Sequence, residues 1–464
     1  MNKLLKILPI VFFSIINLYA EQIPEVYFVS LKENESIPAN PIKKLNDPLV
    51  DIASEKDLIQ LFPSLRYQKI SGFGGCFNEI GGIALTSLSS DEQKKLMQNL
   101  FDAQKAGFTF CRTAVGSSDF GVSAYSYSEI PNDYNMDSFS ILREKKSVIP
   151  YIQLALEYNP YLKLFASPWS PPAWMKMSGK MEGPNENNYL KDDPLIYKSY
   201  ALYFTKYIEE YAKLGIHINR LMVQNETDCN VNYPSCIFPP DKMIKFINNY
   251  LAPMFKEKSI KTEIWGGTYR VVENSSYEAL LLFSDSLIRK NVKGVGMQYQ
   301  EYNHLVDFRM LYPQIPIMHT ECVCYGGENS VDQAYDRLKE IAQYINAGSE
   351  NFTYWNMILD ETSKSGWGWR QNSLITIDKS KNTVKYNPDY AVMYILSHFI
   401  RPGDVRIAHI FMGEDTFAVK DDNGNYKFFV TNRDKQNKTI TIRISGREDV
   451  HVKIPAESLT LVIV

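Results

Sequence analysis

Short apolar segments alternate with longer amphipathic segments between residues 68 and 400, and this unit recurs eight times. The short segments have the length and composition of strands and cover residues 70–77, 108–115, 162–167, 220–224, 262–265, 292–298, 315–320 and 352–355. The longer segments carry apolar residues at helical spacing, most clearly in 200–211 and 331–345. Repeated strand and helix units predict parallel strands joined by helices, and eight of them predict an α/β fold of the (β/α)8 TIM-barrel type. A doubly wound open sheet is the alternative fold, although no Gly-x-Gly-x-x-Gly motif indicates a dinucleotide site.

The pattern changes after residue 401 to apolar and polar positions that alternate with a period of two. The alternating segments are 405–410, 416–419, 426–430, 439–444, 450–454 and 459–464, with a hairpin turn at 421–425. We therefore expect an accessory antiparallel β-sandwich domain over 401–464 beside a barrel over 68–400. Residues 25–30 are also strand-like, which predicts that the N-terminal segment 21–67 partly joins the sandwich.

Residues 1–20 resemble an export signal. Lys3 and Lys6 precede an apolar run over 7–18, and Ala20 supplies the small residue of a cleavage site. The run is shorter than the ~20 residues of a membrane span, so we expect a secreted or periplasmic protein without stable membrane insertion. The sequence does not indicate an oligomeric state.

The charge balance and the cysteines limit the remaining function classes. The 464 residues include 50 basic and 53 acidic side chains, a net charge of −3, so nucleic acid is not an expected partner. Cys229 and Cys236 flank a turn-forming stretch and could form a disulfide or remain free thiols, whereas buried free thiols are expected for Cys76 and Cys111. No second Cys or His motif accompanies 322–324, so neither a metal nor a cofactor is expected.

Two glutamates follow predicted strands of the barrel. Glu226 lies just after the fourth strand and Glu321 just after the seventh. Reactive side chains of such barrels lie at the C-terminal ends of the strands, so the two carboxyl groups should meet at the barrel mouth. A retaining glycosidase needs such a pair about 5 Å apart, with one group as acid and base and the other as nucleophile. The sequence therefore predicts a glycosidase site at this end of the barrel.

Five short motifs occur in one order along the chain. They are Gly-Phe-Gly-Gly at 72–75, Phe-Ala-Ser-Pro-Trp-Ser-Pro-Pro-Ala-Trp at 165–174, Gln-Asn-Glu at 224–226, Thr-Glu-Cys at 320–322 and Tyr-Trp-Asn at 354–356. With these motifs the chain resembles glycoside hydrolase family 30, and in particular its glucosylceramidase-like members. The resemblance covers most of the chain and implies a retaining mechanism on a (β/α)8 barrel.

The resemblance also implies roles for individual residues. Glu226 matches the acid/base and Glu321 the nucleophile, which Arg112 would keep ionised. Asn225 would bind the sugar 2-hydroxyl and Glu79 more distant hydroxyls. The further substrate-binding positions that it implies are Trp169, Trp355 and Asn372, and Gln298 at the end of the sixth predicted strand is another candidate. The chain departs from the family at Thr227, where proline is frequent, and at 297–300, where animal glucosylceramidases have a His-Trp-Tyr run.

These observations favour a secreted retaining β-glycosidase that hydrolyses β-glucosidic bonds of a glycan or glycolipid by double displacement. A β-1,6-glucanase, a β-xylosidase or a β-fucosidase of the same family is the main alternative, because the substrate is selected by loops. A non-catalytic carbohydrate-binding protein would share the barrel, but the two glutamates argue against it. A metal-dependent hydrolase would need ligands that the sequence does not provide.

Overall fold

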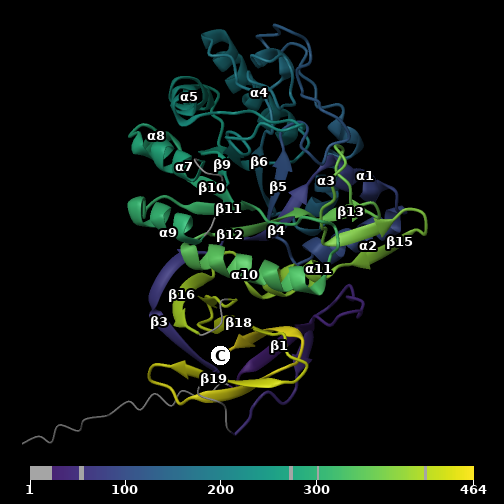
Figure 1. Cartoon of the computed structure of the whole chain (residues 1–464), viewed down its shortest axis with the longest axis vertical. Helices are drawn as coiled ribbons and strands as arrows, with labels where there is room; N and C mark the ends of the chain where they lie inside the picture. Colours follow the sequence, from purple (N-terminus) through teal and green to yellow (C-terminus); the bar gives the residue numbers. More distant parts are fainter. Residues whose placement is uncertain (1–22, 52–56, 271–274, 300–301, 412–414) are drawn as a thin grey trace, which may run out of the picture.

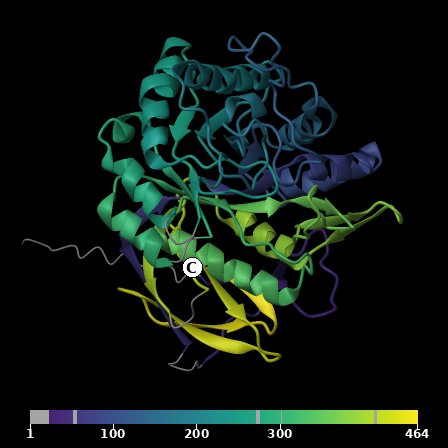
Figure 2. The same ribbon diagram turned by 45° about the horizontal axis from the view of Figure 1, so that its top comes forward.

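The computed structural model describes residues 23–51, 57–270, 275–299, 302–411 and 415–464. Its strands and helices form two parts, a helix-covered barrel and a smaller sheet domain (Figure 1). Helices α10 (Val331–Ala347) and α11 (Pro388–Phe399) lie between the two parts in both views (Figures 1 and 2). Tyr335 of α10 donates a hydrogen bond to the Asn432 carbonyl of the sheet domain, so this helix of the barrel also contacts the sheet domain.

The predicted barrel is confirmed. Its strands are β4 (Gly72–Phe77), β5 (Phe110–Ala114), β6 (Lys163–Ser167), β7 (Ile218–Met222), β8 (Glu263–Trp265), β9 (Thr268–Tyr269), β10 (Val295–Gln298), β11 (Ile317–Glu321) and β12 (Asn351–Asn356). Parallel pairing gives one sheet in the order β12-β4-β5-β6-β7-β8 and a second in the order β11-β10-β9. Single parallel bridges, Asn225 with Thr268 and Ile317 with Ser349, join the sheets at their two edges. All eight predicted strands are present, and β8 and β9 together take the fifth position.

The barrel strands are buried along almost their whole length, as parallel strands covered by helices require. The helices besides α10 and α11 are α1 (Glu79–Thr86), α2 (Ser90–Phe101), α3 (Val148–Tyr158), α4 (Pro194–Ala212), α5 (Pro240–Phe246), α6 (Ala252–Glu257), α7 (Ser275–Ser284), α8 (Ile288–Asn291) and α9 (Tyr302–Leu311). Their ends follow local signals: Ser330 and Gln333 form a capping box on α10, and Gly348 ends it with φ 108°.

In the described residues, the sheet domain is one hydrogen-bonded sheet of nine strands that curls around its own core (Figure 1). The order of the strands is β2-β1-β21-β18-β17-β16-β3-β19-β20. Their bounds are β1 (Glu25–Ser30), β2 (Lys43–Leu45), β3 (Leu58–Lys69), β16 (Val405–Ile410), β17 (Ala418–Lys420), β18 (Tyr426–Asn432), β19 (Lys438–Ile444), β20 (Val450–Ile454) and β21 (Ser458–Ile463). The predicted C-terminal strands and the strand at 25–30 are therefore present, and β1 pairs with β21.

Strand β3 was not predicted. Pro63 interrupts its apolar pattern, and β3 pairs with β16 in an antiparallel ladder that contains two register shifts. Its sequence therefore does not show a simple alternation of apolar and polar residues. A further small sheet of β13 (Ile358–Asp360), β14 (Ile375–Asp378) and β15 (Thr383–Tyr386) lies beside the barrel.

The described residues include all six cysteines, and each is a buried free thiol, so the disulfide considered for Cys229 and Cys236 is not formed. No helix within the described ranges is long and apolar enough to cross a membrane. The predicted signal segment 1–20 lies outside them.

Candidate active site

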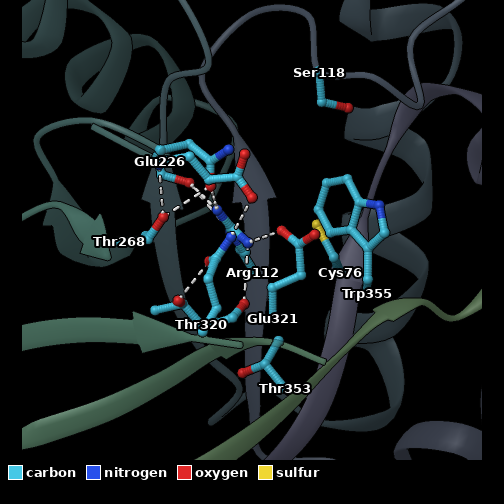
Figure 3. A network of polar contacts seen from close by, with 12 residues as sticks. Cys76, Arg112, Ser118, Glu226, Thr268, Thr320, Glu321, Thr353 and Trp355 are labelled. Carbon is cyan, nitrogen blue, oxygen red and sulfur yellow. Dashed lines mark hydrogen bonds and ion pairs between the residues drawn. The ribbon is translucent and has the colours of Figure 1, made fainter. Parts of the chain in front are cut away.

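Arg112 of β5 is the centre of a buried polar network at the C-terminal end of the barrel strands (Figure 3). One guanidinium nitrogen lies 2.7 Å from Glu321 Oε2 and 3.0 Å from the Thr320 carbonyl oxygen. The other terminal nitrogen donates to Asn225 Oδ1 at 2.6 Å. Arg112 therefore links the ends of β7 and β11, which carry the two predicted catalytic glutamates.

Two tryptophans and a serine fix the Arg112 side chain. The guanidinium lies 4.6 Å from the ring centre of Trp169 and 5.3 Å from that of Trp355, and the two rings are stacked 5.0 Å apart. Ser167 Oγ accepts hydrogen bonds from Nε and Nη2 of Arg112. The two tryptophans thus border the same network, although the walls of a sugar subsite assigned to them remain a prediction. Figure 3 shows the Trp355 ring beside the Glu321 carboxylate.

Glu226 occupies a strained backbone position four residues after the end of β7. Its φ is +46°, in the left-handed region that non-glycine residues rarely adopt. The Glu226 amide donates to the carbonyl and to the hydroxyl of Thr268, both at 3.0 Å, which holds this conformation. Gln298 Nε2 donates to Glu226 Oε1 at 3.0 Å, and Arg270 Nε lies 3.9 Å from Oε2. The predicted residue Gln298 therefore contacts the predicted acid/base directly.

Glu321 is the last residue of β11, where the register with β10 shifts. His319 pairs with Met297 and Glu321 with Gln298, so Thr320 is skipped. Such bulges redirect side chains next to active sites. The hydroxyl of Tyr299 donates to Glu321 Oε1, while Oε2 accepts from Arg112. Figure 3 shows the carboxyl groups of Glu226 and Glu321 directed to the same space beside Arg112.

The protonation of Glu321 differs from the expectation that Arg112 simply keeps it ionised. Burial raises the pKa of Glu321 to about 7, Arg112 and Tyr299 oppose that rise, and the charge of Glu226 adds to it. Arg112 and Tyr299 both stabilise the charged form of Glu321, which is the form that the predicted nucleophile requires.

A third carboxyl group near this pair was not predicted. Asp119 follows β5 in the loop that contains Ser118, and it is 6% exposed. Burial raises the pKa of Asp119 well above its usual range, and the charges of Glu321 and Glu226 raise it further. The one available signal was its position a few residues after a barrel strand, which many loop residues share. Tyr299 and Arg270, which contact the two glutamates, were missed for the same reason.

Glu79 and Asn372 are not part of the Arg112 network. Both oxygens of Glu79, at the start of α1, accept hydrogen bonds from Arg143 at 2.8 and 3.0 Å, and Oε2 also accepts from the Val122 amide. Asn372 is buried, its Oδ1 accepts from the Asn329 amide, and its Nδ2 has no protein partner. Sugar binding by these two residues remains a prediction, and the Arg143 contact means that Glu79 has no oxygen without a donor.

The chemistry available at this site is acid, base and nucleophilic catalysis by carboxyl groups. Within the described ranges, no group of three or more His, Cys, Asp or Glu side chains could hold a metal ion.

The comparisons with known protein families, sequences and structures agree with one another. Residues 70–401 match the model of the glycosyl hydrolase family 30 TIM-barrel domain. "Putative glucosylceramidase 1" of Caenorhabditis elegans is 29% identical over 429 residues, which cover 86% of this chain and 81% of that protein. The lysosomal acid glucosylceramidase of Mus musculus is 27% identical over 414 residues, 83% of this chain and 79% of the mouse protein. The structure of the endo-β1,6-glucanase BT3312 superposes with a TM-score of 0.82 at 22% identity and covers 95% of this chain and 99% of that one.

Proposed function

This chain belongs to glycosyl hydrolase family 30 and is a glycoside hydrolase, and from that premise we propose that it is a secreted, retaining β-glucosidase. The observation that carries the proposal is the hydrogen bonding of Arg112 to both Glu321 and Asn225, which lies next to Glu226. One buried guanidinium thereby orients the two strand ends that bear the carboxyl pair. A retaining mechanism requires such a pair around one anomeric carbon.

In the first step Glu321 attacks the anomeric carbon while Glu226 gives its proton to the leaving oxygen. The glycosidic bond breaks, and a glycosyl ester with Glu321 forms. In the second step Glu226 removes a proton from water, which attacks the same carbon and releases the sugar and Glu321. Asn225 Oδ1 accepts hydrogen bonds from Arg112 and Thr268, and the Asn225 side chain can bind the sugar 2-hydroxyl. That hydrogen bond strengthens as positive charge develops on the ring.

The proposed substrate is a β-glucoside, and glucosylceramide is the first candidate. The support is the name of the relatives matched over more than four fifths of this chain. A β-1,6-glucan is the second candidate, because the structure of an endo-β1,6-glucanase superposes over 95% of the chain. Residues 297–300, which we assign to the subsite for the leaving group, differ in sequence from the animal enzymes. Both candidate substrates therefore need direct assay.

The mechanism is tested with Glu321→Ala and Glu226→Ala, which should each abolish turnover of an aryl β-glucoside without loss of fold. Glu328→Ala removes an exposed carboxylate of the neighbouring loop and is the matched control. Proton NMR of the first product should show the β-anomer. Near-normal turnover by Glu321→Ala would refute the nucleophile assignment, and an α-anomer would refute retention. Glucosylceramide, β-1,6-glucan and aryl xyloside and fucoside assays then identify the substrate.

We also propose export with cleavage after Ala20, on the basis of the apolar run at 7–18. The N-terminal sequence of the protein recovered outside the cytoplasm should begin at Glu21. A cytoplasmic protein that retains Met1 would contradict the proposal.

A further inference from the structure

The barrel is closed between β11 and β12 by little backbone hydrogen bonding. Both strands lie wholly within the part of the chain that the structure describes, and their one backbone bridge joins Ile317 to Ser349, at the start of β11. There the Glu350 amide donates to the Ile317 carbonyl at 3.1 Å. Beyond that point β11 pairs with β10, and β12 with β4. The predicted nucleophile Glu321 therefore ends a strand that has a backbone ladder on one side only.

Side chains replace the missing ladder at His319, two residues before Glu321. The His319 amide donates to Ser349 Oγ at 3.0 Å and to Asn351 Oδ1 at 3.2 Å. The Asn351 amide group returns a hydrogen bond to the His319 carbonyl at 2.8 Å. The His319 ring accepts the Thr353 amide at Nδ1, 3.1 Å away. Both backbone polar groups of His319 and one amide of β12 are thus satisfied by side chains across the seam.

The imidazole of His319 is fixed in a fully buried position. Its ring is stacked on Phe352 with ring centres 3.8 Å apart. The Tyr344 ring lies nearly perpendicular to it, at an interplanar angle of 77° and with ring centres 4.4 Å apart. Because Nδ1 accepts a hydrogen bond, the neutral ring carries its hydrogen on Nε2. That nitrogen lies 3.6 Å from Glu340 Oε1 on α10.

The same helix holds the chain two residues after the nucleophile. The Val323 amide donates to Glu340 Oε1 at 3.2 Å, and Arg337 donates to the Val323 carbonyl. Arg337 also pairs with Glu340, so these contacts form one polar cluster. Glu321 therefore lies between two fixed backbone positions. Side chains that include Asn351 of β12 hold His319, two residues before it, and side chains of α10 hold Val323, two residues after it.

We propose that His319 is a positioning residue for the nucleophile, which acts with Asn351 and Glu340 to fix the end of β11. The proposal rests on the proposed function of Glu321. A buried leucine at this position would leave the Thr353 amide without an acceptor. On this side the end of β11 would then be held only by the bonds of Ser349 and Asn351 to the His319 backbone. Displacement of a reacting group by about 1 Å can cost roughly 100-fold in rate.

The test measures the attack by Glu321 alone, with 2-deoxy-2-fluoro-β-glucosyl fluoride as the probe. The C1–F bond breaks, fluoride leaves, and a stable ester forms between C1 and Glu321, which mass spectrometry locates. We expect labelling of His319→Leu to be roughly tenfold slower than wild type or worse. His319→Asn offers an oxygen in place of Nδ1 to the Thr353 amide, and its labelling rate should recover to within about threefold of wild type.

Ile440→Ala is the matched control, because it opens a cavity in the core of the sheet domain. It should lower the melting temperature while the labelling rate stays that of wild type. If His319→Leu does not fold, Asn351→Asp replaces it: Asp keeps the acceptor for the His319 amide and loses the donor to its carbonyl, and labelling should again slow roughly tenfold.

The outcomes separate the two proposals. Slow labelling of His319→Leu or Asn351→Asp, together with labelling of Ile440→Ala at the wild-type rate, supports the positioning role. Labelling at the wild-type rate in folded His319→Leu, with only a lower melting temperature, would show a purely structural role. A wild-type protein that this probe and its xylosyl and fucosyl analogues leave unlabelled at Glu321 would overturn the catalytic assignment itself.

Discussion

The guanidinium of Arg112 lies 2.7 Å from the carboxylate of Glu321, although their strands, β5 and β11, are not neighbours in the barrel. Both side chains are buried, so this ion pair acts with little screening by solvent. The contact lowers the pKa of a carboxyl group that burial alone would raise further. Arg112 thereby keeps a desolvated carboxylate available as a nucleophile near neutral pH.

Glu226→Gln should separate the two halves of the reaction. The variant cannot protonate a leaving group, so kcat/KM should fall by about 10²- to 10⁴-fold for a glucoside with a poor leaving group such as an alkyl glucoside. Dinitrophenyl glucoside needs no protonation, and its burst of released phenolate should remain fast in stopped-flow measurements.

Glu278→Gln is the control for this variant, because Glu278 is another carboxyl group close by and accepts a hydrogen bond from Thr227. It should leave both substrates within about threefold of wild type. An equal loss on both leaving groups in Glu226→Gln would assign Glu226 a role other than acid catalysis.

Tyr299→Phe should move the acid limb of the pH profile upward. The Tyr299 hydroxyl stabilises the charged form of Glu321, so its loss raises the pKa of Glu321 above about 7. Activity requires the charged form and is lost as pH falls through this pKa. The midpoint of the acid limb of kcat/KM should therefore rise by about one pH unit, as expected for one charge-assisted hydrogen bond.

Tyr312→Phe removes a hydroxyl that donates to the Leu280 carbonyl and should leave this limb unchanged. The two profiles are compared with an aryl glucoside between pH 4 and 9. An acid limb of Tyr299→Phe that moves downward would contradict the assigned hydrogen bond.

Asp119→Asn should weaken catalysis although Asp119 follows no predicted motif. The charges of both glutamates raise the pKa of the buried Asp119 carboxyl group, so the three groups interact electrostatically. We expect this group to bind the same sugar. Loss of one hydrogen bond that involves a charged or strongly polarised group should lower kcat/KM by roughly 10- to 100-fold. Asp241→Asn, on α5, is the matched substitution away from the site and should have the activity of wild type.

The positions of Glu226 and Glu321 were predictable because each lies at the C-terminal end of a short apolar segment, and barrel strands bring their C-terminal ends together. Asp119 and Tyr299 were not predictable in this way, because the path of a loop depends on packing that no periodic pattern records. Glu79 illustrates the converse. Its position after β4 fits a sugar ligand, yet Arg143, 64 residues later in the chain, binds both of its oxygens. Strand β3 was missed because Pro63 and register shifts hide its alternation.

Glu144 provides a prediction about stability. It is 1% exposed, and three tyrosine hydroxyls donate to it: Tyr125 at 2.8 Å, Tyr127 at 2.7 Å, and Tyr211. Burial raises the pKa of Glu144 to about 7, although these donors favour the charged form. The folded protein therefore retains a proton that the unfolded chain, with a pKa near 4.5, has already released. The stability that this proton contributes is complete below about pH 4.5 and is lost as pH rises to about 7.

Glu144→Gln removes this titration. Between about pH 4.5 and 7.5 the free energy of unfolding of the wild type should fall by about 3 kcal/mol relative to the variant, as the difference between the two pKa values of Glu144 requires. Urea denaturation across that range measures both curves. Glu157→Gln, an exposed position on α3, should run parallel to the wild type. Parallel curves for Glu144→Gln and wild type would show that Glu144 is ionised in the folded protein, because a carboxylate held by three hydroxyl donors can remain charged only if their hydrogen bonds outweigh its desolvation.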